Sequence, residues 1–140
     1  MAQAAELLGD RWTLLILREA FYGVQRYDDM RADTGAPRSM LTDRLAKLVA
    51  AGVLERRPYQ EAGDRVRYAY ALTEKGRDLA WVLLAMKEWG EKHLIGGLGP
   101  VAPVDAETGQ ELRLGLHTTD GKPVEISQAR LARREGSDAE

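Results

Sequence analysis

The sequence has no cysteine among its 140 residues. This absence excludes disulfide bonds, thiolate metal ligands, cysteine nucleophiles and redox sensing by a thiol. The two histidines, His93 and His117, lie in different segments without the spacing of metal ligands, so we predict no zinc site. We therefore expect no metal or other cofactor.

Long hydrophobic runs are missing as well. The longest, such as TLLIL at residues 13–17, are far shorter than the roughly 20 residues that a membrane-spanning helix needs. We find no signal peptide ahead of this run. The sequence predicts a soluble, cytoplasmic protein without a membrane partner.

Neither sign of charge dominates the chain. The 20 lysines and arginines and the 22 aspartates and glutamates give a net charge of −2. No global positive field draws the protein to nucleic acid, so any such affinity must be local. The length predicts one folded domain with appendages.

Three helices are predicted in the first third of the chain. The first ends at Gly9, and the second runs from about Asp10, a suitable N-cap, to Tyr22. A third covers RYDDMRAD at residues 26–33, and the turn TGAP at residues 34–37 follows it. Glycine in this turn suits a left-handed C-cap and proline suits the first position of the next helix. Two helices joined by so short a turn indicate a helix-turn-helix.

The helix that follows, between Gly35 and Gly52, has two contrasting faces. Its apolar face, about a third of the circumference, consists of Met40, Leu41, Leu45 and Leu48. The opposite face carries Ser39, Asp43, Ala46, Lys47 and Ala50, with Arg38 and Thr42 at its flank. The leucines indicate packing on a core. The polar face is either a solvated surface or a contact surface.

A β-hairpin is predicted next. The strand VLERRPY begins at residue 53, the loop QEAGD contains Gly63, and RVRYAYALT returns with alternating aromatic residues. Such a hairpin is a β-wing. The tyrosines at 22, 27, 59, 68 and 70 occupy apolar positions, so we expect them to pack in the core or on strands rather than stack on bases.

One long helix is predicted from the Thr73 cap to about Leu94. One stripe of apolar residues on it consists of Leu79, Val82, Leu83, Met86 and Trp89, and a second contains Trp81 and Leu84. A single domain of this size cannot easily cover both stripes, so we expect a second subunit. The two tryptophans pack in the interface or line a pocket for a small-molecule effector.

The chain changes character at Ile95. Residues 95–109 are rich in glycine and proline and are typical of a linker. Asp120 and Gly121 predict a small hairpin within residues 111–126, and the last dozen residues are expected to be frayed. We divide the chain into a winged domain at 1–94 and a linker, hairpin and tail at 95–140.

Several motifs occur in a fixed order between Ala5 and Leu94: AELLGDRWTLLILREAFYG, RYDDMRADTGAPRSMLTDRLAKLVAAGVLERRPY, RYAYALTEKGRDL and EWG. This series resembles the HxlR family of bacterial winged helix-turn-helix regulators. The resemblance implies a mostly helical α+β fold and a homodimeric transcription regulator. It also implies that the helix between Gly35 and Gly52 enters the major groove and that the wing touches the flanking backbone.

Members of that family often carry a cysteine just ahead of the first helix, and some use it to sense electrophiles or oxidants. This chain has none. Either the sequence begins inside the family's N-terminal arm, or this member does not sense by thiol chemistry. The segment after residue 95 is similar to extensions on some members.

We expect double-stranded DNA to meet the polar helix face and the wing. The candidate residues are Arg38, Ser39, Thr42, Asp43, Lys47, Arg65 and Arg67. Arg38 can pair with guanine or with a phosphate, and Asp43 can accept from cytosine or orient an arginine. We expect Arg44, nearer the leucines, to snorkel or to pair with an acid. The wing arginines, together with Arg56 and Arg57, can meet phosphates or the minor groove.

We expect the homodimer to join through the first helices and the long helix. The candidate interface residues are Leu7, Leu8, Trp12, Leu79, Val82, Leu83, Met86 and Trp89. Two subunits place two half-sites roughly 34 Å apart, so the operator is expected to be pseudo-palindromic. We expect the regulator to block or adjust transcription, and of these we favour a repressor.

Two other functions compete with this interpretation. An enzyme could use Asp105, Glu107, Glu111 and His117, but these lie in a loop-like segment, and the chain has no phosphate-binding glycine motif or nucleophile elbow. We therefore expect no enzyme. The alternative is a winged-helix module that binds another protein and not DNA, which the sequence does not exclude.

Overall fold

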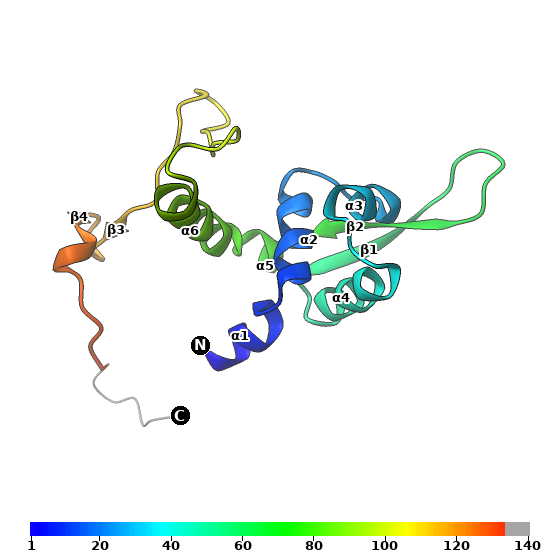
Figure 1. The fold of residues 1–140 in the computed structure, drawn as a ribbon, viewed down its shortest axis with the longest axis horizontal. Coiled ribbons are helices and arrows are strands. Elements are labelled where there is room, and N and C mark those ends of the chain that lie inside the picture. The colour runs from blue at the N-terminus through cyan, green and yellow to red at the C-terminus, as the bar shows by residue number, and fades with distance from the viewer. Residues whose placement is uncertain (134–140) are drawn as a thin grey trace.

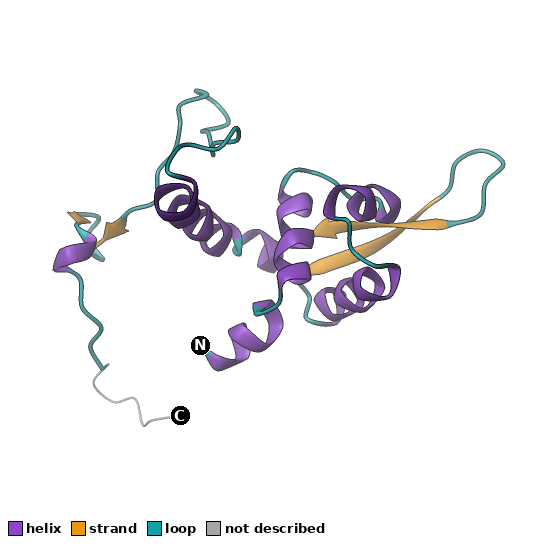
Figure 2. Ribbon diagram, in the orientation of Figure 1, coloured by secondary structure: helices purple, strands orange, loops and turns teal. Residues whose placement is uncertain are grey.

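The computed structural model describes residues 1–133 and shows a winged helix-turn-helix body, a separate C-terminal helix and an extended C-terminal segment (Figure 1). The body comprises α1 (Ala2–Leu8), α2 (Arg11–Phe21), α3 (Tyr27–Thr34), α4 (Arg38–Ala50), β1 (Leu54–Tyr59), β2 (Arg67–Leu72) and α5 (Glu74–Arg77). After it come α6 (Ala80–Gly90), the π-helical turn η1 (Glu91–Ile95), β3 (Leu116–His117), β4 (Pro123–Val124) and the 3₁₀ turn η2 (Ile126–Gln128). The fold is therefore α+β and mostly helical, as predicted (Figure 2).

The start of α2 is fixed by its cap. The Asp10 carboxylate accepts hydrogen bonds from the backbone N–H groups of Trp12 at 3.0 Å and Thr13 at 3.2 Å. These are two of the N–H groups that a helix leaves without an internal partner. The predicted N-cap is confirmed.

The helix-turn-helix is formed by α3, a short turn and α4. Gly35 ends α3 with a φ of 67°, a left-handed conformation that glycine adopts without steric cost. Pro37 is the N-cap of α4, with a φ of −56° and a ψ of 142°. This is one position earlier than predicted, because its extended ψ delays the first helical residue to Arg38.

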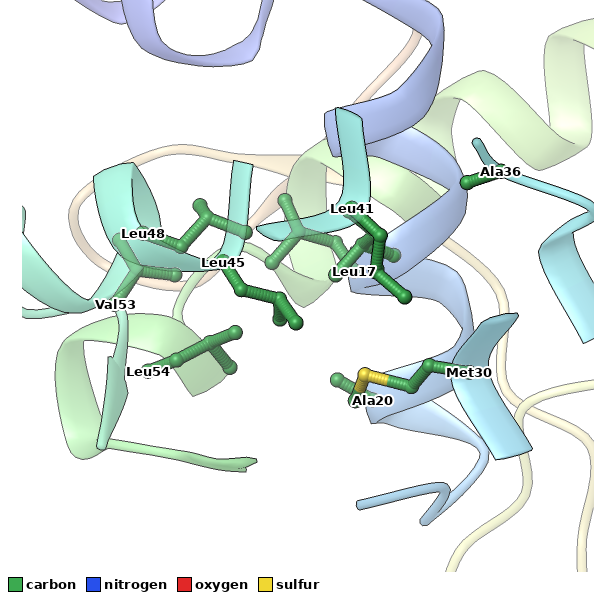
Figure 3. Close-up of a cluster of buried hydrophobic side chains, with 10 residues drawn as sticks. Leu17, Ala20, Met30, Ala36, Leu41, Leu45, Leu48, Val53 and Leu54 are labelled. Atoms are coloured by element: carbon green, nitrogen blue, oxygen red, sulfur yellow. The ribbon is translucent and has the colours of Figure 1, made fainter. Parts of the chain in front are cut away.

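The core lies between α2, α3, α4 and the start of β1 (Figure 3). Leu41, Leu45 and Leu48 of α4 are fully buried, and so are Ile16 of α2 and Met30 of α3. Burying each of these side chains stabilises the fold by about 1.5–3 kcal/mol. The apolar face predicted for α4 is confirmed by its three leucines, whereas Met40 is only half-buried.

The wing is an antiparallel hairpin whose register runs from Leu54 opposite Leu72 to Tyr59 opposite Arg67. An isolated bridge between Arg26 and Ala69 adds a third segment beside β2, so β1 with its Pro58 is an edge strand. The loop between β1 and β2 projects far from the body (Figure 1).

The helical segment predicted from Thr73 to about Leu94 has the expected cap and ends at Ile95, but the prediction of one unbroken helix is wrong. The structure contains α5, a turn, α6 and η1 in its place. The reason is a tertiary contact. Gly76 lies against the backbone carbonyl of Val53 so closely that a Cβ would collide with it. Just after this contact, the backbone N–H of Leu79 donates to the carbonyl of Gly76, and the N–H of Val82 donates to the carbonyl of Leu79. These bonds span three residues instead of four, so they interrupt the α-helical hydrogen-bond pattern.

Residues 97–133, here called the arm, leave the end of η1, loop beside α6 and continue to the β3–β4 hairpin on the far side of α6 from the winged body (Figure 1). The predicted hairpin is present but short, with β3 and β4 joined by a turn at Gly121, whose φ is 88°. The start of the predicted frayed tail, residues 129–133, has no helix or strand, and its remainder lies outside the described residues. No helix in residues 1–133 is long and apolar enough to span a bilayer.

Candidate nucleic-acid interface

The polar face of α4 is open to solvent. Its predicted contact residues Arg38, Ser39, Thr42, Asp43 and Lys47 are all exposed, on the side of the helix opposite the buried leucines. A side chain can reach a base edge only from such a face. The structure therefore brings these five residues together on one accessible surface.

Tyr27 connects α3 to this surface. Its hydroxyl lies 3.1 Å from the Arg38 carbonyl oxygen and 3.1 Å from the Thr42 hydroxyl. A tyrosine has one proton to donate, and the carbonyl can only accept. The Thr42 hydroxyl must then donate to Tyr27, which leaves Thr42 free to act as an acceptor toward solvent. Sequence reasoning treated Tyr27 only as a core contact and missed this role, because the bond spans 15 positions.

A charged network joins α4 to the start of α2. Arg44 donates to the Asp10 carboxylate at 3.0 Å and also pairs with Asp43, and Lys47 lies 3.2 Å from Asp43. The expected pairing of Arg44 with an acid is confirmed. Of the two roles considered for Asp43, these contacts favour orienting an arginine.

The pKa values of the two carboxyl groups reflect this network. Burial raises the pKa of Asp10, but hydrogen bonds from Thr13 and Arg44 outweigh that effect and hold it below its ordinary value. The pKa of Asp43 is lowered chiefly by the hydrogen bond from Lys47, with a further contribution from Arg44. Both groups are therefore ionised at neutral pH.

The wing carries exposed arginines whose charges are partly shared with neighbours. Arg67 lies 3.6 Å from Asp28 of α3 and 3.7 Å from Asp64 of the loop. The Arg56 guanidinium stacks over the ring of Tyr68 at 4.3 Å. Within residues 1–133, no ion pair involves Arg65, which is exposed at the end of the wing loop.

The tyrosines fall into two groups. Tyr27 and Tyr70 are half-buried against the core, and Tyr59 is half-buried beneath the Arg26 guanidinium. Burial raises the pKa of Tyr70. Tyr22 is 54% exposed and Tyr68 is 41% exposed. The expectation of packing is therefore wrong for Tyr22, which follows the last residue of α2 and lies beyond the helix face that contacts the core.

The residues predicted for a dimer interface differ in exposure. Val82, Met86 and Trp89 of α6 are exposed, as is Trp81. The other five predicted residues pack partly against the core of their own chain: Leu7, Leu8, Trp12, Leu79 and Leu83.

The C-terminal carboxylates considered for catalysis have structural roles or are dispersed. Asp105 accepts hydrogen bonds from the Thr108 backbone and hydroxyl at 2.7 and 2.8 Å, and the backbone bond is the main reason that its pKa is lowered. His117 is exposed on β3. In the described part of the chain no three His, Asp or Glu side chains are grouped as metal ligands. Neither the groove between α1 and α4 nor the pocket beside the wing includes Trp81 or Trp89.

The HxlR-like helix-turn-helix family model matches residues 7–96. The chain belongs to this family. Its HxlR-like segment is similar to an uncharacterized HTH-type transcriptional regulator of Mycobacterium tuberculosis, at 45% identity over 100 residues, covering 71% of this chain and 62% of that protein. A relative from Synechocystis, also an uncharacterized HTH-type transcriptional regulator, is 38% identical over 64% of this chain and 65% of its own length. The chain thus spans about three fifths of the length of its mycobacterial relative.

Solved structures support the same family and fold. The crystal structure of a proposed transcription factor aligns over 95% of this chain and 93% of its own, with a TM-score of 0.77 and 32% identity. A proposed transcription factor from Pseudomonas aeruginosa aligns over 98% and 93%, with a TM-score of 0.66 and 34% identity. The reduced redox regulator HypR covers 65% of this chain and 89% of its own, at 30% identity and a TM-score of 0.58. The HxlR-like chain therefore has the winged helix-turn-helix fold of transcriptional regulators.

Proposed function

We propose that the chain is a homodimeric repressor that binds a pseudo-palindromic operator in double-stranded DNA. One observation carries the proposal: α4 buries three leucines and turns an exposed polar face outward beside an arginine-bearing wing. The family membership of residues 7–96 supports the same function. In this arrangement α4 lies in the major groove and the wing follows the neighbouring backbone.

The N-terminal half of α4 reads base edges. Arg38 donates to guanine O6 and N7 or to a phosphate, and Ser39 contacts a base or a phosphate. Thr42 accepts from an amino group of adenine or cytosine, because its own proton is directed to Tyr27. Asp43 holds Arg44 and Lys47 in place, and Lys47 approaches the phosphate backbone.

The wing supplies phosphate contacts through Arg65 and Arg67. The carboxylates near Arg67 lie at 3.6 and 3.7 Å on the surface, where an ion pair contributes only about 0–1 kcal/mol. A phosphate can therefore replace them at little cost. Since the chain carries a net charge of −2, such contacts must be local and sensitive to salt.

The dimer supplies the second reading helix. Val82, Met86 and Trp89 form an exposed apolar face on α6, and α1 with Leu7 and Leu8 extends the interface. We assign residues 1–94 to DNA binding and dimerisation and residues 95–140 to a linker, a hairpin and a tail. Two α4 helices then read half-sites roughly 34 Å apart.

The test begins by recovering the operator from genomic DNA bound to the purified protein. Fluorescence anisotropy with that duplex and with a scrambled duplex then measures affinity over a salt series from about 50 to 200 mM. We expect tighter binding to the operator and a loss of affinity on both duplexes as salt rises. No binding at any salt would overturn the proposal and favour a protein-interaction module. A reporter under the operator that falls in expression when the regulator is deleted would overturn the repressor role.

A further inference from the structure

The chain exposes far more surface than a compact monomer of its mass. Its accessible surface is 11160 Å² for 15.5 kDa, whereas a compact monomer of that mass exposes about 7,200 Å². Even if residues 134–140 were fully extended, they would account for only about 1,100 Å² of the difference. Roughly 2,800 Å² per chain is therefore surface that a folded protein of this size normally covers.

Most of the large apolar residues that are exposed in the described chain lie in α6, η1 and the arm. Trp81 is 68% exposed and Trp89 is 58% exposed on α6. In the arm, Leu98 is 82% exposed and Ile126 is 77% exposed. Single exposed apolar residues are common on proteins, but a continuous series of large ones over two neighbouring segments marks an interaction surface.

The chain does not cover this surface itself. Two carboxylates hold the arm at the far end of α6: Glu91 accepts from the Gly99 backbone at 2.6 Å, and Glu88 accepts from the Leu114 backbone at 3.1 Å. Lys87 fixes Glu91 from the helix side at 2.6 Å. Within residues 1–133 no ion pair joins the arm to the winged body, and the β3–β4 hairpin lies apart from it (Figure 1).

We propose that the arm of each subunit packs on a second copy of this chain and covers the apolar face of that copy's α6. The inference rests on the homodimer of the proposed function and adds the arm to its interface. In a two-fold dimer the same pair of surfaces meets twice, so an arm that leaves its own α6 uncovered shields the partner's helix.

Area and charge both favour a second copy as the occupant. Obligate homodimers bury about 2,000–5,000 Å² in total, which 11-residue α6 helices cannot reach by their mutual contact alone. The excess accessible surface of the two chains together is large enough for such an interface once the arms take part. Residues 97–133 carry four basic and five acidic side chains, so the arm has no net positive charge to attract nucleic acid.

The first experiment measures the dimer dissociation constant by sedimentation. Leu98→Asp and Ile126→Asp each place a charge at an exposed apolar position of the arm, so neither disturbs the core. Each substitution occurs twice in a dimer. We expect each substitution to raise the dissociation constant at least about tenfold. The matched control is Gln110→Asp, which adds the same charge at an exposed polar position of the arm and should leave the constant within about twofold. Wild-type dimerisation by both apolar-site variants overturns the inference.

The second experiment asks which chain the arm contacts. Because the protein has no cysteine, introduced thiols are the only ones present. One tagged chain carries Leu98→Cys and one untagged chain carries Ala85→Cys, an exposed position between the tryptophans of α6. After mixing and treatment with a short bis-maleimide, we expect a covalent heterodimer, and none with Ala62→Cys at the wing loop. An absence of that heterodimer, or closure within one chain by the double variant, overturns the inference.

These outcomes separate the two proposals. If the wild-type protein and the arm variants all dimerise and bind the operator, only the proposed role of the arm is excluded. If the wild-type protein is monomeric and binds no DNA, the proposed function itself is excluded.

Discussion

The hydroxyl of Tyr27 lies 3.1 Å from the hydroxyl of Thr42, so that α3 determines which hydrogen-bonding group α4 presents on its exposed face. The same tyrosine hydroxyl donates to the carbonyl of Arg38, at the first turn of α4. One side chain thus fixes both the position of the helix start and the polarity of a candidate base contact.

Tyr27→Phe should weaken operator binding and relax base preference at the position that Thr42 reads. Removing the hydroxyl loses two surface hydrogen bonds, each contributing about 0.5–1.5 kcal/mol, and frees the Thr42 proton to donate. Anisotropy titrations with operators changed one base pair at a time measure both effects. Tyr22→Phe is the matched control, since Tyr22 is exposed at the C-terminal end of α2. Equal affinity and unchanged base preference for the two variants would contradict this role.

Arg38→Ala should cost about 1–3 kcal/mol of operator affinity if the guanidinium meets a base edge. Competition between the operator and a scrambled duplex distinguishes this contact from a phosphate contact. An equal loss on both duplexes would assign Arg38 to the backbone, and no loss on either would remove it from the interface. Lys92→Ala, an exposed cation on η1, controls for the loss of one positive charge.

Asp10→Asn should destabilise the fold at neutral pH and have little effect in acid. The pKa of Asp10 is lowered in the folded state from a reference of 3.8, so the ionised carboxylate stabilises the fold above pH 3.8. That contribution disappears as the pH falls through the lowered folded-state pKa. Urea unfolding at pH 7 and at stepwise lower pH should therefore show the curves of wild type and variant converging. A constant gap between them at every pH would show that the charge of Asp10 does not matter.

Gly76→Ala should lower the free energy of unfolding by about 1–3 kcal/mol, because the added Cβ collides with the backbone carbonyl of Val53. Gly90→Ala is the matched control, since Gly90 is also helical and has open space at its Cβ position. That change should stabilise by up to about 1 kcal/mol through the helix propensity of alanine. Thermal unfolding of both variants tests the pair, and a stable Gly76→Ala protein would refute the account of the helix break.

Met86→Glu and Trp89→Glu should each produce monomers with weak operator affinity. Both side chains are exposed on α6, so a charge there does not disturb the core but does oppose burial in an interface. Sedimentation velocity measures the oligomeric state, with Ala62→Glu in the wing loop as a control. Dimers that persist in both variants would exclude this face from the interface.

The helix-turn-helix could be predicted from the sequence because its signals are local. The N-cap at Asp10, the left-handed glycine at position 35 and the spacing of Leu41, Leu45 and Leu48 each act within a few residues. The exposed polar face of α4 follows directly from the same spacing.

The features that sequence reasoning missed depend on distant contacts. The break after α5 depends on the approach of Gly76 to Val53, which lies 23 positions earlier in the chain. The bond from Tyr27 to Thr42 requires the packing angle between two helices. Neither relationship leaves a periodic pattern. Helical spacing shows on which side of a helix a residue lies, but it does not show how far the end of the helix lies from the core. For this reason the exposure of Tyr22 could not be predicted.

The bond between Arg44 and Asp10 has a mechanical consequence. Asp10 lies between α1 and α2. Its carboxylate caps the start of α2 and also accepts a hydrogen bond from Arg44 of α4 at 3.0 Å. A shift of the N-terminal helix that pulled Asp10 away would break the ion pair between α4 and the start of α2 and leave Arg44 paired with Asp43 alone. If α4 contacts DNA as proposed, this bond couples a change near the N-terminus to the helix that meets the duplex.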